Sequence, residues 1–252
     1  MIGSDAKSMR GFLHSLIDWS SVQCVLDLGC GTGYDLHQIG KLTSAQALLV
    51  GIDSSRPSIE QAIFDARQDS RFSFSVTDIA TRLPFPDQHF DVVFSNNVLE
   101  CISEKPSLLR EVDRILKQDG QFLCAHFDWD SQLINGSNKP LIRKIVHAFA
   151  DWQQPWMRAC DGWMGRRLWP AIEHTGLFAG SMVSYVLTNT VYEPSFYGYE
   201  RIQDFAYLVE AGQVEAREYQ SFLGDIADAA TKGQYFYSIT MYAYLGRKKT
   251  KT

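Results

Sequence analysis

Residues 24–35 read CVLDLGCGTGYD, a short apolar run that leads into a glycine-rich turn. The glycines are Gly29, Gly31 and Gly33, and Tyr34 stands where a dinucleotide-binding fingerprint would place its third glycine. Asp27 comes two residues before the first glycine. The pattern predicts a strand, then a tight loop whose backbone approaches a ligand closely, then a helix.

Strand and helix signals alternate along the first half of the chain, as in a parallel sheet with crossover helices. After the strand at residues 24–28, further strands are expected at 47–53, 72–76, 90–95 and 121–127. Apolar residues recur at helical spacing in segments 36–42, 56–68 and 107–117. Two β-rich runs, residues 182–192 and 235–246, would complete the sheet.

Two stretches lack a regular strand pattern, and we interpret them as covers over the substrate. They are residues 128–165, which are polar and aromatic, and residues 192–231, which include a helical stretch. The interpretation is a single domain over residues 1–252, in which residues 1–127 form the cofactor-binding half.

Composition narrows the class of protein further. The chain has 252 residues, a formal net charge of −5 and no apolar run near the ~18 residues that span a membrane. An acidic chain does not attract nucleic acid as a whole, so neither nucleic acid nor membrane is an expected partner. Its five cysteines include no C-x-x-C pair, which favours free thiols in the cytoplasm and predicts no metal site. A monomer or homodimer is expected.

Three acidic residues lie at or just after the ends of the first three predicted strands, and these ends meet at one edge of a parallel sheet. Asp27 would repel a pyrophosphate, whereas an ammonium group at ~4 Å would gain roughly 4 kcal/mol before desolvation. Asp53 would accept hydrogen bonds from a ribose diol. Asp78 would accept one from an exocyclic amine, with Ile79 packed on the base. A ligand with an amino group, a ribose, an adenine and no phosphate is S-adenosyl-L-methionine.

Four motifs in order resemble the class I S-adenosylmethionine-dependent methyltransferases. They are VLDLGCGTG (25–33), GIDSS (51–55), VTDIATRLPFPDQHFDVVFSNNVLECI (76–102) and LLREVDRILKQDGQFL (108–123). As a set they are similar to the ubiquinone- and menaquinone-biosynthesis methyltransferases and related biosynthetic enzymes that act on small molecules.

The resemblance implies a fold and a set of cofactor contacts. The fold is an α/β, Rossmann-like, seven-stranded and mostly parallel sheet, with helices on both faces, an antiparallel last strand and an inserted helical and aromatic lid. Gly29, Gly31 and Gly33 would hold the methionine part, with Asn96 beside it. The motif of Asp53 and Ser54 would bind the ribose, and Asp78 and Ile79 the adenine. The product would be S-adenosyl-L-homocysteine.

Residues at the end of the fifth predicted strand are candidates for catalysis. His126, Asp128 and Asp130 alternate and would project to one side of the strand. His126, assisted by Asp128, is a candidate general base near the transferred methyl group. The alternative is that these side chains anchor the loop by hydrogen bonds. A metal site from the same three residues is the weakest interpretation.

Aromatic residues are concentrated after this strand. Five of the six tryptophans lie between residues 129 and 169, and several tyrosines follow. Flat aromatic faces can stack on a planar acceptor or hold a cationic one. Trp129, Trp156, Tyr197 and Tyr207 are the candidates for substrate binding, and the alternative is that they pack in the core.

The predicted function is methyl transfer from S-adenosylmethionine to an O, N or C atom of a small molecule that is planar or aromatic. The alternatives are a methyltransferase that acts on RNA or protein, and a cofactor-binding module without catalysis. The motif SNNV at residues 95–98 differs from the one in methyltransferases that modify amino groups of nucleic acids. Cys101 stands where related sequences often have histidine, which argues against acid–base chemistry at that position.

Overall fold

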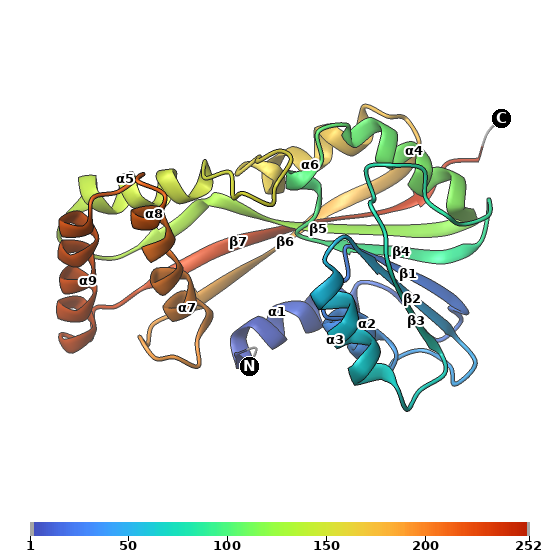
Figure 1. Ribbon diagram of the computed structural model, residues 1–252, viewed down its shortest axis with the longest axis horizontal. Helices are drawn as coiled ribbons and strands as arrows, with labels where there is room; N and C mark the ends of the chain where they lie inside the picture. The colour runs from blue at the N-terminus through green and yellow to red at the C-terminus, as the bar shows by residue number, and fades with distance from the viewer. Residues whose placement is uncertain (1–2, 251–252) are drawn as a thin grey trace. The chain divides into compact units, whose positions relative to one another are not determined.

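The computed structural model describes residues 3–250, which form a seven-stranded sheet in the order β3-β2-β1-β4-β5-β7-β6 (Figure 1). The strands are β1 (Cys24–Leu28), β2 (Leu48–Asp53), β3 (Phe72–Val76), β4 (Phe90–Asn96), β5 (Leu116–Ile134), β6 (Phe178–Asn189) and β7 (Tyr237–Lys248). The helices are α1 (Ser4–Ser15), α2 (Tyr34–Ile39), α3 (Arg56–Ala66), α4 (Lys105–Ile115), α5 (Lys139–Ala150), α6 (Met164–Glu173), α7 (Tyr197–Asp204), α8 (Ala206–Glu210) and α9 (Ala216–Thr231).

The first five strands are parallel, as the alternating pattern predicts. Strand β1 pairs with β2 and with β4, and Asp27 lies opposite Gly51 on one side and Phe94 on the other. All five residues of β1 are buried, which explains why this strand is almost continuously apolar rather than alternating. Asp53 at the end of β2 pairs with Val76 at the end of β3. The carboxyl ends of these strands therefore share one edge of the sheet.

Strand β7 is antiparallel to β5, as the resemblance implies. Asn135 N donates to Phe236 O at 3.0 Å, and Thr240 N donates to Ser131 Oγ at 2.9 Å. The residue number rises along one strand as it falls along the other, which shows that the two strands are antiparallel. Helices α2 and α3 cover one face of the sheet near β2 and β3, and α4 covers the other (Figure 1). The predicted fold class is confirmed.

The segment that follows residue 127 is more regular than the sequence suggests. Strand β5 does not end there but continues to Ile134, because β7 pairs with this extension. Helix α5 then buries Ile142, Ile145, Val146 and Phe149 on one side. Asn138 begins this helix by accepting a hydrogen bond from Leu141 N, a cap that its sequence could have indicated.

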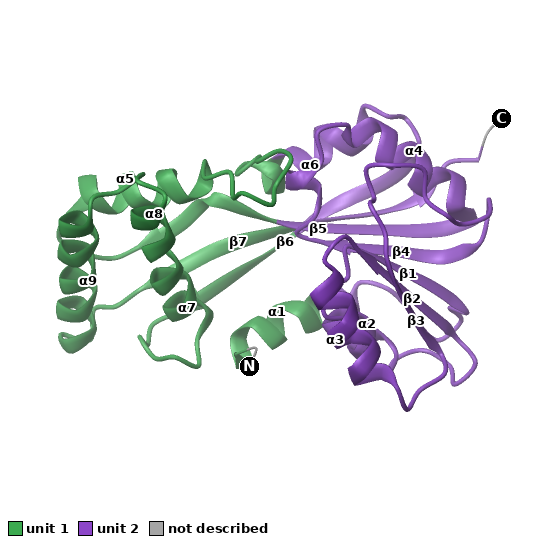
Figure 2. Cartoon of the chain, in the orientation of Figure 1, with its two compact units in different colours: residues 1–12, 127–166, 184–242 green, residues 13–126, 167–183, 243–252 purple. Residues whose placement is uncertain are grey.

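The chain divides into two compact units (Figure 2). Unit 1 comprises residues 1–12, 127–166 and 184–242, and unit 2 comprises residues 13–126, 167–183 and 243–252. The interpretation of one domain with two covering segments stays a prediction. Within residues 3–250, none of the helices combines the length and the apolar character that crossing a membrane requires.

Candidate functional site

The glycine loop of unit 2 needs its glycines for two different reasons. Gly29, Gly31 and Gly33 have positive φ angles of 79°, 52° and 79°, in the left-handed region that disfavours other residues. A Cβ at Gly29 would lie 2.4 Å from Cγ2 of Val98, so a side chain would collide there. A Cβ at Gly31 would meet no atom within 4 Å. The loop therefore packs tightly at Gly29 and is open at Gly31, where a ligand has room.

Asp53 is joined to this loop by hydrogen bonds. Its Oδ2 accepts from Gly31 N at 2.9 Å and its Oδ1 accepts from Ser55 N at 2.8 Å. Ser55 is the N-cap of α3, and the exposed Ser54 lies between them. Each carboxylate oxygen can accept a further hydrogen bond, and the side chain is only partly buried. Asp53 can thus order the loop and bind a diol at the same time.

A negative electrostatic environment surrounds the start of the loop. Asp27 is 2% exposed within β1. Burial raises the pKa of the Cys30 thiol far above its usual value, and the nearby charges of Asp27 and Asp53 raise it further. The thiol therefore stays protonated and is no nucleophile. The same two carboxylates would favour a cationic ligand.

Asn96 carries an unsatisfied polar atom. Its Nδ2 donates to Asp35 Oδ2 at 3.4 Å, whereas its buried Oδ1 has no hydrogen-bond partner among residues 3–250. A buried acceptor without a donor costs about 1–3 kcal/mol, so native proteins rarely keep one without a reason. The ammonium group of the methionine part would supply the missing donor. The residues present therefore fit this cofactor.

Two residues that the sequence analysis missed hold Asn96 in place. Asp35 is 6% exposed and His14 is 4% exposed, and His14 Nε2 lies 2.9 Å from Asp35 Oδ1. Asp35 was visible within the glycine-loop segment as a polar residue at the start of α2. His14 offers no local signal, because the pair is 21 residues apart.

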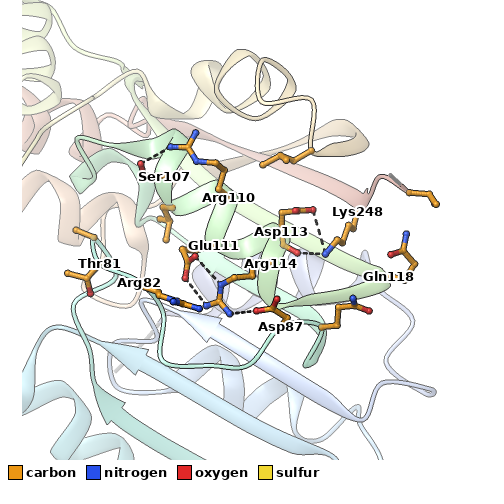
Figure 3. Close-up of a pocket in the computed structure, with 15 residues that line it drawn as sticks. Thr81, Arg82, Asp87, Ser107, Arg110, Glu111, Asp113, Arg114, Gln118 and Lys248 are labelled. Carbon is orange, nitrogen blue, oxygen red and sulfur yellow. Dashed lines mark hydrogen bonds and ion pairs between the residues drawn. The ribbon is translucent and has the colours of Figure 1, made fainter. Parts of the chain in front are cut away.

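The segment between β3 and β4, which contains Asp78 and Ile79, is fastened to α4. Arg114 donates to Leu83 O at 2.9 Å and to Phe85 O at 2.8 Å, and forms an ion pair with Asp87. Its second carboxylate partner is Glu111, whose pKa Arg114 lowers (Figure 3). Asp78 accepts a hydrogen bond from Ala80 N at 3.0 Å and is partly exposed, and Ile79 is buried. The assignment of both residues to adenine stays a prediction.

His126 is completely buried in unit 2. Its Nε2 lies 3.8 Å from Oε1 of Glu100, which is itself 4% exposed and belongs to the short 3-10 helix Leu99–Cys101. Glu100 is a third residue that the sequence analysis did not select, since no local pattern links it to His126. The role of His126 as a general base stays a prediction, and its full burial favours the anchoring alternative.

Asp128, in unit 1, is engaged by an arginine from a distant segment. Arg166 donates from Nε to Oδ2 and from Nη2 to Oδ1, both at 2.5 Å, and its backbone N donates to Oδ2 at 3.2 Å. The Asp128 side chain is 1% exposed. A carboxylate held by two guanidinium nitrogens is a poor proton acceptor, so this geometry supports anchoring rather than catalysis.

The metal interpretation finds no support in the described residues. No group of three or more histidine, cysteine or acidic side chains between residues 3 and 250 is placed to hold an ion. Asp130 instead accepts a hydrogen bond from the Trp163 indole at 3.1 Å and lies 3.3 Å from His147 Nε2.

Three of the four candidate substrate residues belong to an aromatic cluster in unit 1. Phe127 contacts Trp129 and Tyr197 at ring-centroid distances of 5.1 and 5.3 Å. Phe149 extends the cluster from Trp129 to Trp152, whose ring stacks on Tyr207 at 6.1 Å. Trp156, by contrast, is 67% exposed and donates its indole N–H to Gln154. Substrate binding by these residues stays a prediction.

Comparison with known proteins identifies the family. A family model described as "Methyltransferase domain" matches residues 20–177. The chain belongs to this methyltransferase family. The match covers the glycine loop, Asp53, Asp78 and Asn96, so the predicted membership of the class I S-adenosylmethionine-dependent enzymes is confirmed.

Two relatives and one solved structure show how far the similarity extends. The methyltransferase is 26% identical over 244 residues to an uncharacterized 37.1 kDa protein in transposon TN4556 of Streptomyces fradiae, covering 96% of this chain and 67% of the relative. It is 28% identical over 189 residues to the 2-methyl-6-phytyl-1,4-hydroquinone methyltransferase of Synechocystis sp. The match covers 71% of this chain and 55% of that relative. The chain thus spans between half and two thirds of these relatives. The YcgJ protein of Bacillus subtilis shares the fold, with a TM-score of 0.65 and 18% identity. The match covers 97% of this chain and 100% of YcgJ.

Proposed function

We propose that this methyltransferase transfers the methyl group of S-adenosylmethionine to an O, N or C atom of a small, planar or aromatic acceptor. The observation that carries the proposal is the buried Oδ1 of Asn96, which has no donor among residues 3–250. A ligand with an ammonium group beside the open side of the glycine loop would satisfy it. The Synechocystis relative, a 2-methyl-6-phytyl-1,4-hydroquinone methyltransferase, supports a planar acceptor.

The residues of the chain would act mainly by position. When bound, S-adenosylmethionine would supply an activated methyl group on a sulfonium sulfur, which becomes the thioether of S-adenosylhomocysteine. Asp27 and Asp53 would favour the cationic ligand by charge, and Asn96 would fix its amino-acid end. Holding an acceptor in line with the methyl group can supply roughly 7–11 kcal/mol.

Calorimetric titration tests the proposal. We expect S-adenosylmethionine and S-adenosylhomocysteine to bind with micromolar affinity and NAD not to bind. Asn96→Ala should weaken the binding of S-adenosylmethionine and of S-adenosylhomocysteine by about tenfold, or ~1.4 kcal/mol, because it removes one hydrogen bond to a charged group. Asn135→Ala, at an exposed asparagine, is the matched control. Binding of NAD alone would exclude the proposed cofactor.

We also propose a cytoplasmic protein that acts as a monomer or homodimer on a small molecule. The five cysteines are free thiols in the structure, which suits a reducing compartment. Light scattering after size exclusion, without and with S-adenosylhomocysteine, measures the oligomeric state.

A further inference from the structure

A pocket in unit 2 lies beside α4 and is lined by charged side chains (Figure 3). Its volume is about 830 Å³, within the range of pockets that hold small molecules. The residues assigned to the cofactor are not among the described residues that line it. Two apolar residues, Leu108 and Leu177, line it together with the charged ones. The pocket is therefore separate from the proposed cofactor site.

Each acidic side chain that lines this pocket already has a cationic partner. Asp87 pairs with Arg114 at 2.8 Å, and Glu111 pairs with the same guanidinium at 2.7 Å. Asp113 lies 3.7 Å from the Lys248 ammonium, which also donates to the backbone oxygen of Asp113 (Figure 3). These carboxylates therefore offer little to a cationic ligand.

Two arginines of the same pocket have no acidic partner among residues 3–250. Arg82 forms neither a hydrogen bond nor an ion pair in this part of the chain, and Arg110 donates only to the Ser107 hydroxyl, at 3.0 Å. Arg114 lowers the pKa of Glu111 most, and the charge of Arg82 adds to this lowering, so Arg82 lies near α4. The uncompensated charge of the pocket is thus positive, on a chain whose formal net charge is −5.

The backbone on both sides of Arg82 is already ordered. Thr81 donates from its backbone N and from its hydroxyl to Asp78 O, at 3.3 and 2.8 Å. Leu83 N donates to Oε2 of Glu111 at 2.9 Å. Arg110 is fixed in a similar way, because it belongs to α4. A ligand that binds these two arginines would therefore cause little loss of backbone entropy.

We propose that this pocket binds a small polyanion through Arg82 and Arg110, at a site separate from that of the cofactor. A guanidinium presents N–H donors in a planar fork that matches a carboxylate or a phosphate. Two unpaired guanidinium groups at one pocket suit a ligand with at least two negative charges. The acidic side chains do not oppose it, because their own charges are neutralised by Arg114 and Lys248.

Calorimetric titration of the full chain tests the proposal with two defined anions. Citrate supplies several carboxylates and pyrophosphate supplies two phosphates, and acetate, with a single carboxylate, is the matched probe. At constant ionic strength we expect citrate or pyrophosphate to bind saturably, at least tenfold more tightly than acetate. The tighter of the two shows whether the pocket prefers carboxylates or phosphates. Absence of saturable binding by both, or equal affinity for acetate, would overturn the inference.

Substitutions locate the bound anion. Arg82→Gln and Arg110→Gln should each weaken its binding at least fivefold. Arg67→Gln has the same loss of charge at an exposed arginine of unit 2 that does not line the pocket, and it should change the affinity less than twofold. Both tested side chains are exposed, so we expect the variants to fold, and thermal unfolding verifies this. Unchanged affinity in both variants, or an equal loss in Arg67→Gln, would contradict the proposed site.

Competition with S-adenosylhomocysteine distinguishes this site from that of the cofactor. We expect the anion to bind the saturated chain as well as the free one. A dissociation constant for the anion that rises in proportion to the S-adenosylhomocysteine concentration would place the anion in the cofactor site and overturn the inference. The first titration uses the free chain, so a failure of S-adenosylhomocysteine to bind would refute the proposed function and leave the result for the anion intact.

Discussion

Asp53 shows how one residue can serve both the fold and the ligand. Its carboxylate accepts hydrogen bonds from the backbone of the glycine loop and of the α3 cap, through Gly31 and Ser55. The ligand therefore meets an acceptor whose position is already set, so less conformational entropy is lost on binding. Asn96 is oriented in the same way, through Asp35 and His14.

Replacing Asp53 by alanine should weaken the binding of S-adenosylmethionine ten- to hundredfold, or by about 1.5–3 kcal/mol, because a charged hydrogen-bond acceptor is lost. The loop amides lose their acceptor as well, so a lower unfolding temperature is expected. Calorimetric titration and thermal unfolding separate the two effects. Asp65→Ala, on the exposed side of α3, is the control. Unchanged affinity in a folded variant would show that Asp53 does not bind the cofactor.

Cysteine reactivity should follow burial. Burial raises the pKa of the Cys24 thiol to about 11, and it raises those of Cys30 and Cys124 further. Iodoacetamide reacts with thiolates, so at pH 8 we expect labelling only at the partly exposed Cys101 and Cys160. Mass spectrometry of the folded protein measures this, and unfolded protein provides the fully labelled reference. Rapid labelling of Cys30 would contradict the environment described for the loop.

At the scale of elements, α4 supports the segment that carries Asp78 and Ile79. Arg114 holds the carbonyl oxygens of Leu83 and Phe85 and two carboxylates, and its side chain is 17% exposed. The helix contributes this clamp from the face opposite to its buried leucines, in a region where no cofactor contact is predicted. A distant element can thus control the geometry of a binding segment.

Arg114→Met should lower the free energy of unfolding by about 2–3 kcal/mol, because several acceptors lose a charged donor at once. Cofactor affinity should also fall, by several-fold, since the segment of Asp78 loses its support. Chemical denaturation and titration measure the two changes. Arg110→Met, at an exposed arginine on the same helix, should leave both nearly unaltered. Equal changes in stability and affinity in the two variants would show that the contacts of Arg114 do not support this segment.

The Glu111 carboxylate gives this clamp a dependence on pH. Arg114 holds the pKa of Glu111 below its ordinary value of 4.5, so the folded state prefers the ionised form. The stabilisation is present above pH 4.5 and is lost as the pH falls through the lower folded-state pKa. We expect Glu111→Gln to make unfolding less sensitive to pH below 4.5. Denaturation curves between pH 3 and 6 for both proteins test this, and parallel curves would contradict it.

At the scale of the whole molecule, the predicted contacts divide by unit. Every residue assigned to the cofactor lies in unit 2, whereas the four aromatic candidates for the acceptor lie in unit 1. The four motifs of the resemblance also lie within unit 2, so we expect changes in the proposed acceptor segments to leave cofactor binding unaltered. This division would let one cofactor site serve different acceptors.

Trp129→Ala and Tyr197→Ala should therefore reduce acceptor binding or turnover and leave cofactor affinity within about threefold, or ~0.6 kcal/mol. Each variant is measured twice, by cofactor titration and by acceptor kinetics, with far-UV circular dichroism to confirm folding. Val186→Ala, at an exposed residue of unit 1, is the control. Loss of cofactor binding with normal acceptor kinetics would show that these residues contact the cofactor and not the acceptor.

Local patterns along the chain located the first four strands, whereas the seven-stranded sheet with its antiparallel last strand came from the family resemblance, and the cofactor contacts stay predictions. Glycine spacing, apolar strand runs and the acid after each strand are signals within a few residues of one another, and their physical cause is local backbone geometry. They place β1 to β4 correctly to within a few residues. The continuation of β5 to Ile134 was missed, since it depends on pairing with β7, about one hundred residues later.

The contacts of His14, Glu100 and Arg166 required the folded chain. Asp128 was a candidate for catalysis beside His126, since its partner Arg166 is 38 residues away and only packing brings the two together. Likewise, nothing near Asn96 in sequence predicts that one amide oxygen would be buried without a donor. Burial and long-range pairing are properties of the tertiary structure, because they depend on which distant side chains exclude water from each polar atom.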